Sequence, residues 1–169
     1  MGRFYEQSII PAQLRRNFDV YERIRTLGID LGTLADRVRS LKGAGIAGAI
    51  FHESGLVYLS GVGLGERQMS DDPERVALGQ AAGKACADHH IATLHWAIAC
   101  GGEGGDLNDV LYTVKVLGMV VSTDVDFRSG PAVVNGYSFR WQSVFGGGAG
   151  QFAVEGLDAG GYAGVHARS

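Results

Sequence analysis

The chain has 169 residues, 46% of them hydrophobic and 20% charged, which suits one domain, with or without extra segments, around an ordinary core. Its net charge of -3 excludes a broad attraction to nucleic acid or to an anionic membrane surface. No run reaches the roughly 18 apolar residues of a membrane span, and the N-terminus lacks a signal-peptide core. Two cysteines do not suggest a disulfide framework, so we expect a soluble, reducing, cytoplasmic setting.

Residues 1–42 are predicted to form an N-terminal arm that contains one short helix. Apolar side chains recur at helical spacing from Phe18 to Leu27, and Gly28 suits the position that ends a helix. A β-hairpin is expected within residues 43–63. Two apolar runs there flank the turn sequence His52-Glu-Ser-Gly55.

The clearest helix is predicted to begin at Pro73, because proline suits the first helical position. Asp71 or Asp72 can cap it, and the glycines of Gly101-Gly-Glu-Gly-Gly105 end it. Seven residues form the stripe that we expect to be buried: Leu78, Ala82, Ala85, His89, Ala92, Trp96 and Ala99. Most are small, so the helix can lie close to its neighbours.

Residues 109–121 are rich in β-branched side chains and apolar on both faces, which predicts a central strand that is covered on both sides. A second helix is expected from Pro131 to Gly146, with Val134, Tyr137, Trp141 and Val144 on its buried stripe. No further helix remains to cover the other face of the strand. The pattern therefore favours an oligomer, with another subunit on that face.

The last segment, 147–169, is glycine-rich without a sustained period and is predicted to be loop. Without a strand after Ser169, one sheet edge would expose unpaired N–H and C=O groups, to which a partner protein could bind. Residues 150–157 hold the apolar cluster of this tail and could instead cover that edge as a substitute strand. We expect order in the tail only where a neighbouring subunit adds contacts.

Four possible metal ligands, Cys86, His89, His90 and His95, lie in the long helix. No HExxH or CxxC motif accompanies them, so we interpret them as helix surface and core and predict no metal site. Gly61-Val-Gly-Leu-Gly65 follows a strand, but no helix follows directly. A nucleotide-binding loop is therefore not predicted, and we expect no cofactor.

Five segments match, in order, segments of a known family. They are Asp19 to Ile29, Gly55-Leu-Val-Tyr-Leu-Ser-Gly61, Leu107 to Val120, Phe127 to Tyr137, and His166-Ala-Arg-Ser169. Together they resemble the RidA (YjgF-type) family. The resemblance implies an α+β, chorismate-mutase-like fold: a mixed β-sheet with two helices packed on one face, assembled as a homotrimer. Residues 43–146 would form this domain, and 147–169 its tail.

The resemblance also implies hydrolysis of reactive imines and enamines, or of 2-aminomuconate-type carboxylates, to ketone and ammonia in a cleft between subunits. Arg168 and Asn135 would be the catalytic residues, with Arg168 binding the substrate carboxylate, since a guanidinium matches a carboxylate bidentately. Ser60, Gly61 and Ser169 would bind the rest of this small metabolite.

A second function remains open. Where the family carries a pocket tyrosine on the first hairpin strand, this chain has Gly45-Ile-Ala-Gly-Ala49. In this alternative, we expect a non-catalytic trimer with a ligand-binding or regulatory function, or a partner subunit of another enzyme.

Overall fold

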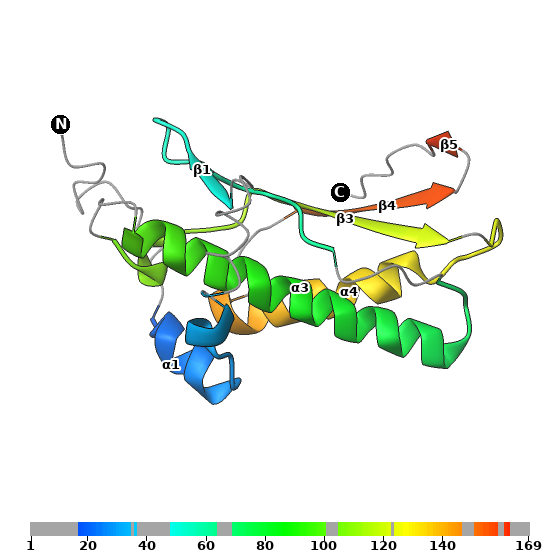
Figure 1. The fold of residues 1–169 in the computed structure, drawn as a ribbon, viewed down its shortest axis with the longest axis horizontal. Helices are drawn as coiled ribbons and strands as arrows, with labels where there is room; N and C mark the ends of the chain where they lie inside the picture. Colours follow the sequence, from blue (N-terminus) through cyan, green and yellow to red (C-terminus); the bar gives the residue numbers. More distant parts are fainter. Residues whose placement is uncertain are drawn as a thin grey trace. The chain divides into compact units, whose positions relative to one another are not determined.

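The computed structural model describes residues 17–34, 36, 48–63, 69–100, 105–122 and 124–146, and the backbone of 151–158 and 161–162. They divide into two compact units. Unit 1 holds the residues up to Gly61 and from His89 to Tyr112, and unit 2 holds those from Val62 to Asp88 and from Thr113 onward. The long helix α3, Pro73–Cys100, contributes residues to both (Figure 1). The α+β class is confirmed.

In unit 1 the predicted short helix is present as α1, Val20–Thr26. The Asp19 carboxylate accepts the Tyr21 backbone N–H at 2.9 Å, which satisfies a free donor of the first turn. Gly28 follows the helix with a φ of 66°, a conformation that glycine adopts without steric cost. The helix buries Val20 and Ile24 completely or nearly so.

The predicted hairpin is also confirmed. Its strands are β1, Ala49–Phe51, and β2, Val57–Leu59, which pair antiparallel with Ile50 opposite Tyr58. Gly55 closes the turn with a φ of 82°. Both Ile50 and Tyr58 are exposed, so this pair leaves an apolar surface on one side of the hairpin.

The first part of α3 belongs to unit 2 and begins where the sequence predicted. Asp72 accepts the Glu74 backbone N–H at 2.9 Å, as an N-cap residue does. Asp71 has another role, because its carboxylate accepts the backbone N–H groups of Arg128 and Ser129 at 2.8–3.1 Å. A side-chain hydrogen bond from Ser129, together with these backbone hydrogen bonds, lowers the pKa of Asp71, and the bonds fix the chain just before the second helix.

The buried stripe predicted for α3 is wrong in part. Leu78, Ala85 and Ala99 are exposed, whereas Gly79, Ala87, Ile91, Thr93 and Leu94 are buried. Alanine and glycine occur all round this helix, so its sequence gives little contrast between faces.

The second helix is confirmed as α4, Gly130–Phe145, and the four residues of its predicted stripe are all buried. The backbones of α3 and α4 approach closely at two glycines. A methyl group at Gly136 would overlap the Gln80 carbonyl, and one at Gly83 would lie 3.0 Å from the Tyr137 backbone nitrogen. Glycine is therefore a steric requirement at Gly136, and a methyl group at Gly83 would make a tight backbone contact.

The strand predicted for 109–121 is shorter and later than expected. Residues Leu107–Asp109 form the 3₁₀ helix η3 in unit 1, and the strand β3 spans Lys115–Ser122 in unit 2. Asp106 and Asp109 cap η3 reciprocally, so this local hydrogen bonding competes with an extended backbone. β3 is also not central, because it forms one edge of the sheet order β3-β4-β5 among the described strands.

The loop predicted for the tail is wrong over two segments. Gln151–Asp158 form the strand β4, which pairs parallel with β3 from Lys115↔Gln151 to Ser122↔Asp158. Gly161–Tyr162 form β5, antiparallel to β4. The substitute strand was the alternative weighed above, and its backbone ladder with β3 supplies hydrogen bonds that each contribute about 0.5–1.5 kcal/mol net. A neighbouring subunit's part in ordering the tail stays a prediction.

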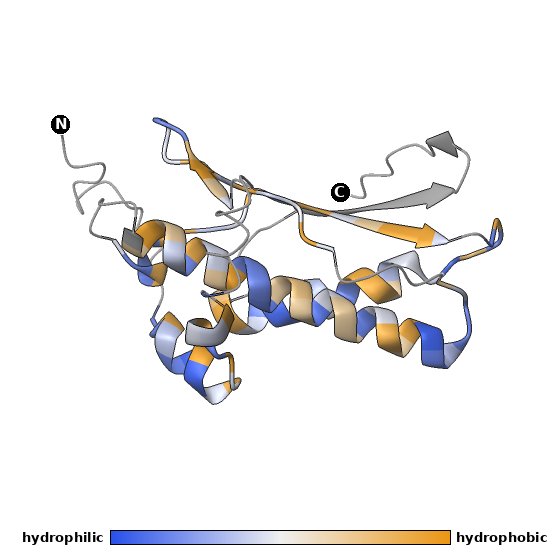
Figure 2. Ribbon diagram, viewed as in Figure 1, coloured by the Kyte–Doolittle hydropathy of each residue, from blue (hydrophilic) through white to orange (hydrophobic). Residues whose placement is uncertain are grey.

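The two faces of β3 differ. Gly118 and Val120 face α4, where Val120 joins a core of Met69, Val133 and Val134. The other face is apolar and exposed: Leu117, Met119 and Val121 are 47%, 61% and 54% accessible. Figure 2 shows the hydrophobic character of this strand along most of its length. Of the helices in the described part of the chain, none is long and apolar enough to cross a membrane.

We predict that Gly136→Ala destabilises the protein by about 1–3 kcal/mol, because the added methyl group overlaps the Gln80 carbonyl of α3. This loss exceeds the gain of about 1 kcal/mol that alanine brings to a helix. Urea unfolding measures the change. Gly63→Ala is the control, since a methyl group there meets nothing within 4 Å. Equal stability of the two variants would contradict the steric argument.

Candidate functional site

The structure gives Ser60 and Gly61, two of the five predicted site residues, a defined place at the end of β2 in unit 1. Ser60 is half-buried, and its backbone N–H and hydroxyl both donate to the Gly48 carbonyl, at 3.1 and 3.4 Å. Gly61 is exposed. The hairpin thus holds Ser60 firmly and presents the next residue to solvent.

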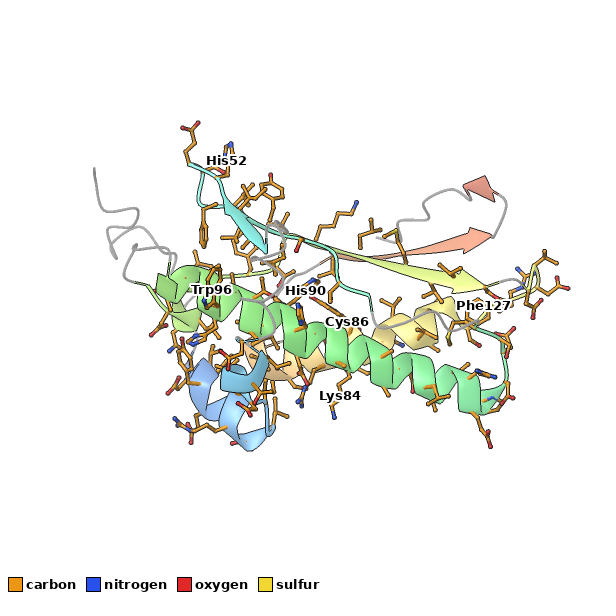
Figure 3. All side chains as sticks on the ribbon, in the orientation of Figure 1. His52, Lys84, Cys86, His90, Trp96 and Phe127 are labelled. Carbon is orange, nitrogen blue, oxygen red and sulfur yellow. The ribbon has the colours of Figure 1, made fainter. Side chains whose placement is uncertain are left out.

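His90 holds the same residue from the other side. Its Nε2 lies 2.9 Å from the Ser60 carbonyl oxygen, and since a carbonyl only accepts, Nε2 must carry the proton. Figure 3 shows His90 and Cys86 as neighbours along α3. Burial lowers the pKa of His90, and the bond to Ser60 opposes this shift only in part. His90 is therefore a neutral donor of fixed tautomer at neutral pH.

Cys86, one turn earlier on α3, is not set up as a nucleophile. Its thiol lies 3.7 Å from the Val62 carbonyl oxygen, to which it donates a weak hydrogen bond. Burial raises the pKa of the thiol above its ordinary value. Because the thiolate is the reactive form, Cys86 acts here as a packing group.

The other two histidines of α3 have structural partners. His89 is buried, and its carbonyl accepts the Thr93 hydroxyl at 2.8 Å. His95 Nδ1 lies 3.0 Å from the Tyr21 hydroxyl of α1. That hydroxyl also accepts the Leu107 backbone N–H at 3.3 Å, so Tyr21 links α1 to two other segments of unit 1. Within the described ranges, no group of three His, Cys, Asp or Glu side chains could hold a metal ion.

The other three predicted site residues lie elsewhere in the chain, in unit 2 or outside the described residues. Asn135 is exposed on α4, in unit 2, and its carbonyl accepts the Ser138 hydroxyl. Arg168 and Ser169 lie outside the described residues. The candidate site therefore consists of the Ser60–Gly61 peptide and His90.

A concavity lies between α3 and α4 in unit 2, with a volume of about 520 Å³. Its polar side chains are occupied by helix packing. Gln80 donates to the Ala132 carbonyl at 3.1 Å, and Arg140 forms a bidentate pair with Asp88 at 2.6 and 3.1 Å. Lys84 and the exposed Phe139 complete the rim. This open groove gives no convergent set of groups for chemistry.

Sequence reasoning considered His90 only as a metal ligand and missed its bond to Ser60. The one available signal was its four-residue step from Cys86, which places both on one face of α3. Its partner lies 30 residues away in sequence, and no local pattern encodes that distance. The carboxylate of Asp71, which holds the start of α4, was missed for the same reason.

Comparison with known proteins gives a fold but no family. No family model matches the chain, and no curated protein matches it significantly. A solved structure is similar: the protein Atu1372, of unknown function, from Agrobacterium tumefaciens. The two chains are 24% identical, the match covers 79% of this chain and 87% of that one, and the TM-score is 0.54. At this identity the likeness shows a shared fold alone.

We predict that Tyr21→Phe destabilises the protein by about 1–3 kcal/mol, because it leaves the buried Leu107 N–H and the His95 Nδ1 without the hydroxyl. Chemical unfolding measures the difference. The matched control is Tyr58→Phe. Tyr58 is 58% exposed, so the loss of its hydroxyl should cost less than about 0.5 kcal/mol. A similar loss of stability in both variants would show that the contacts of the Tyr21 hydroxyl add no stability of their own.

Proposed function

We propose that this chain is a RidA-type deaminase, which hydrolyses reactive imine or enamine carboxylates, including 2-aminomuconate-type compounds, to ketone and ammonia. The observation that carries the proposal is the Ser60–Gly61 peptide. It stands at the strand end where the family places its pocket, it is held by Gly48 and His90, and Gly61 is exposed. The five-segment resemblance and the α+β fold support the same assignment.

In this reaction the protein mainly binds and orients the substrate. Arg168 binds the substrate carboxylate, and Asn135 and Ser169 supply polar contacts to the bound molecule. A water adds to the imine carbon, and the C–N bond then breaks to release ammonia and leave the ketone. No bond to the protein forms, so the rate gain comes from orientation and from stabilising charge.

We further propose a chorismate-mutase-like homotrimer, with α3 and α4 on one face of a mixed sheet and a neighbouring subunit on the other. The exposed face of Leu117, Met119 and Val121 supports this assembly. A contiguous apolar sheet face in contact with water is unfavourable. Assembly with further copies of the same chain removes this face from water. The substrate cleft then lies between subunits.

A non-catalytic function is the second candidate: a ligand-binding or regulatory trimer, or a partner subunit that pairs along the free edge of β3. The stretch Gly45-Ile-Ala-Gly-Ala49 favours it, since the family's ligand-contacting tyrosine is missing there. The free edge of β3, among the described strands, offers unpaired backbone groups to a partner. Binding of a 2-oxo acid without turnover of the corresponding imine would identify this function.

For the enzymatic function, we predict ammonia release from a 2-imino acid generated in situ by an amino-acid oxidase. Arg168→Ala should lower kcat/KM about a hundredfold, which equals roughly 2.7 kcal/mol of lost transition-state binding. Arg128→Ala is the control, because this side chain is exposed and pairs only weakly with Asp126. Wild-type protein that gives no acceleration over buffer removes the deaminase proposal.

For the assembly, we predict that the wild-type chain is a trimer by size-exclusion chromatography with light scattering, and that Met119→Lys is a monomer. The lysine would place an unpaired charge in an apolar interface. Val125→Lys, at an 82% exposed loop position, should remain a trimer. A wild-type monomer, or a Met119→Lys trimer, contradicts the assembly.

A further inference from the structure

His90 holds the peptide group that joins Ser60 to Gly61 at its carbonyl, and two hydrogen bonds to Gly48 anchor Ser60 itself. Ser60 donates its N–H and its hydroxyl to the Gly48 carbonyl, and its own carbonyl accepts the Nε2–H of His90 at 2.9 Å. His90 is itself half-buried on a 28-residue helix. The orientation of this peptide plane is therefore set by a side chain of α3 and not by solvent.

Peptide geometry then determines where the Gly61 N–H points. In a planar trans peptide the C=O and the following N–H lie on opposite sides of the chain, and no cis bond occurs in the described segments. Since the Ser60 carbonyl points to His90, the Gly61 N–H points away from it.

The surroundings of Gly61 leave that donor accessible. Gly61 is exposed, and a methyl group built on its Cα would meet nothing within 4 Å. In the part of the chain that the structure describes, its N–H makes no hydrogen bond. With no side chain at this position, a ligand oxygen can approach the backbone closely.

We infer that His90 is a positioning residue, which holds the Ser60–Gly61 peptide so that the Gly61 N–H donates a hydrogen bond to a carboxylate oxygen of the bound 2-imino or 2-oxo acid. The inference rests on the proposed function, which assigns Ser60 and Gly61 to the substrate site. A backbone N–H aimed at an anion acts without reorganisation, because the protein has already oriented its dipole. His90 supplies this orientation through its hydrogen bond to the Ser60 carbonyl and does not touch the ligand.

The ionisation state of His90 suits this role. Burial lowers its pKa, so the ring stays neutral with its single proton on Nε2, and the bond to Ser60 is a permanent one at neutral pH. The amide of glutamine can replace this Nε2–H, whereas methionine fills similar space and donates nothing. His90→Gln and His90→Met therefore form a matched pair.

The experiment is an NMR titration of the full-length protein with pyruvate, the simplest 2-oxo acid of the proposed product class. In the wild type, pyruvate should shift the Gly61 amide resonance. His90→Met should weaken pyruvate binding about tenfold, the value of one hydrogen bond to a charged group, while His90→Gln stays within about threefold of the wild type. Amide spectra outside residues 48–63, together with thermal melting, establish that both variants fold.

The outcomes separate this inference from the deaminase proposal. If the wild type releases no ammonia but pyruvate still shifts Gly61 in a His90-dependent way, the positioning role holds and only catalysis fails. If the wild type is active and folded His90→Met keeps both its KM and its pyruvate affinity, the inference is overturned. An unshifted Gly61 amide at saturating pyruvate, or at the highest pyruvate concentration reached, overturns it as well, with or without activity.

Discussion

The close approach of α3 and α4 is the constraint on which unit 2 depends. Helix backbones reach this distance only where side chains are absent, and Gly83 and Gly136 provide the two gaps. The same approach brings Gln80 to the Ala132 carbonyl. α4 can then turn its apolar stripe toward β3, because its other side is already held by α3.

Polar contacts complete this helix pair. Arg140 and Asp88 form a bidentate ion pair that is largely shielded from water, which makes its geometry specific as well as attractive. Trp141 stacks on Tyr137 and donates its indole N–H to the Thr113 hydroxyl at 2.7 Å. No buried polar side-chain atom among the described residues lacks a partner. Apolar packing and hydrogen bonding thus stabilise the same arrangement of α3 and α4 in unit 2.

Unit 1 uses a different device, since its helix and hairpin are too short to bury a large core. Side chains tie distant segments to backbone groups: Asn108 accepts the Val20 N–H at 2.9 Å, and Tyr21 and His90 each bind a backbone group from another element. Such bonds are directional, so they place a loop more exactly than apolar contacts do. This is why a strand end such as Ser60–Gly61 can be held in one orientation and serve as part of a site.

The sequence alone determined the elements with strong local signals. The structure contains the helix start that Pro73 and the two aspartates before it predicted. It also contains the helix ends at Gly28 and Gly146 and the four-residue apolar stripe of α4. The candidate site was predicted only in part, because the resemblance pointed to Ser60 and Gly61 but not to His90, which bonds the Ser60 carbonyl.

Tertiary structure decided the rest. The buried face of α3 depended on glycines that contact α4. A helix made mostly of small residues has little contrast between its faces, so its own sequence does not show which face is buried. The tail strand β4 depended on an eight-residue ladder with β3, whose register joins residues about 36 positions apart, from Lys115↔Gln151 to Ser122↔Asp158. His90 likewise found its acceptor 30 residues away. Local propensity acts over a few residues, whereas each of these outcomes required two distant segments to meet.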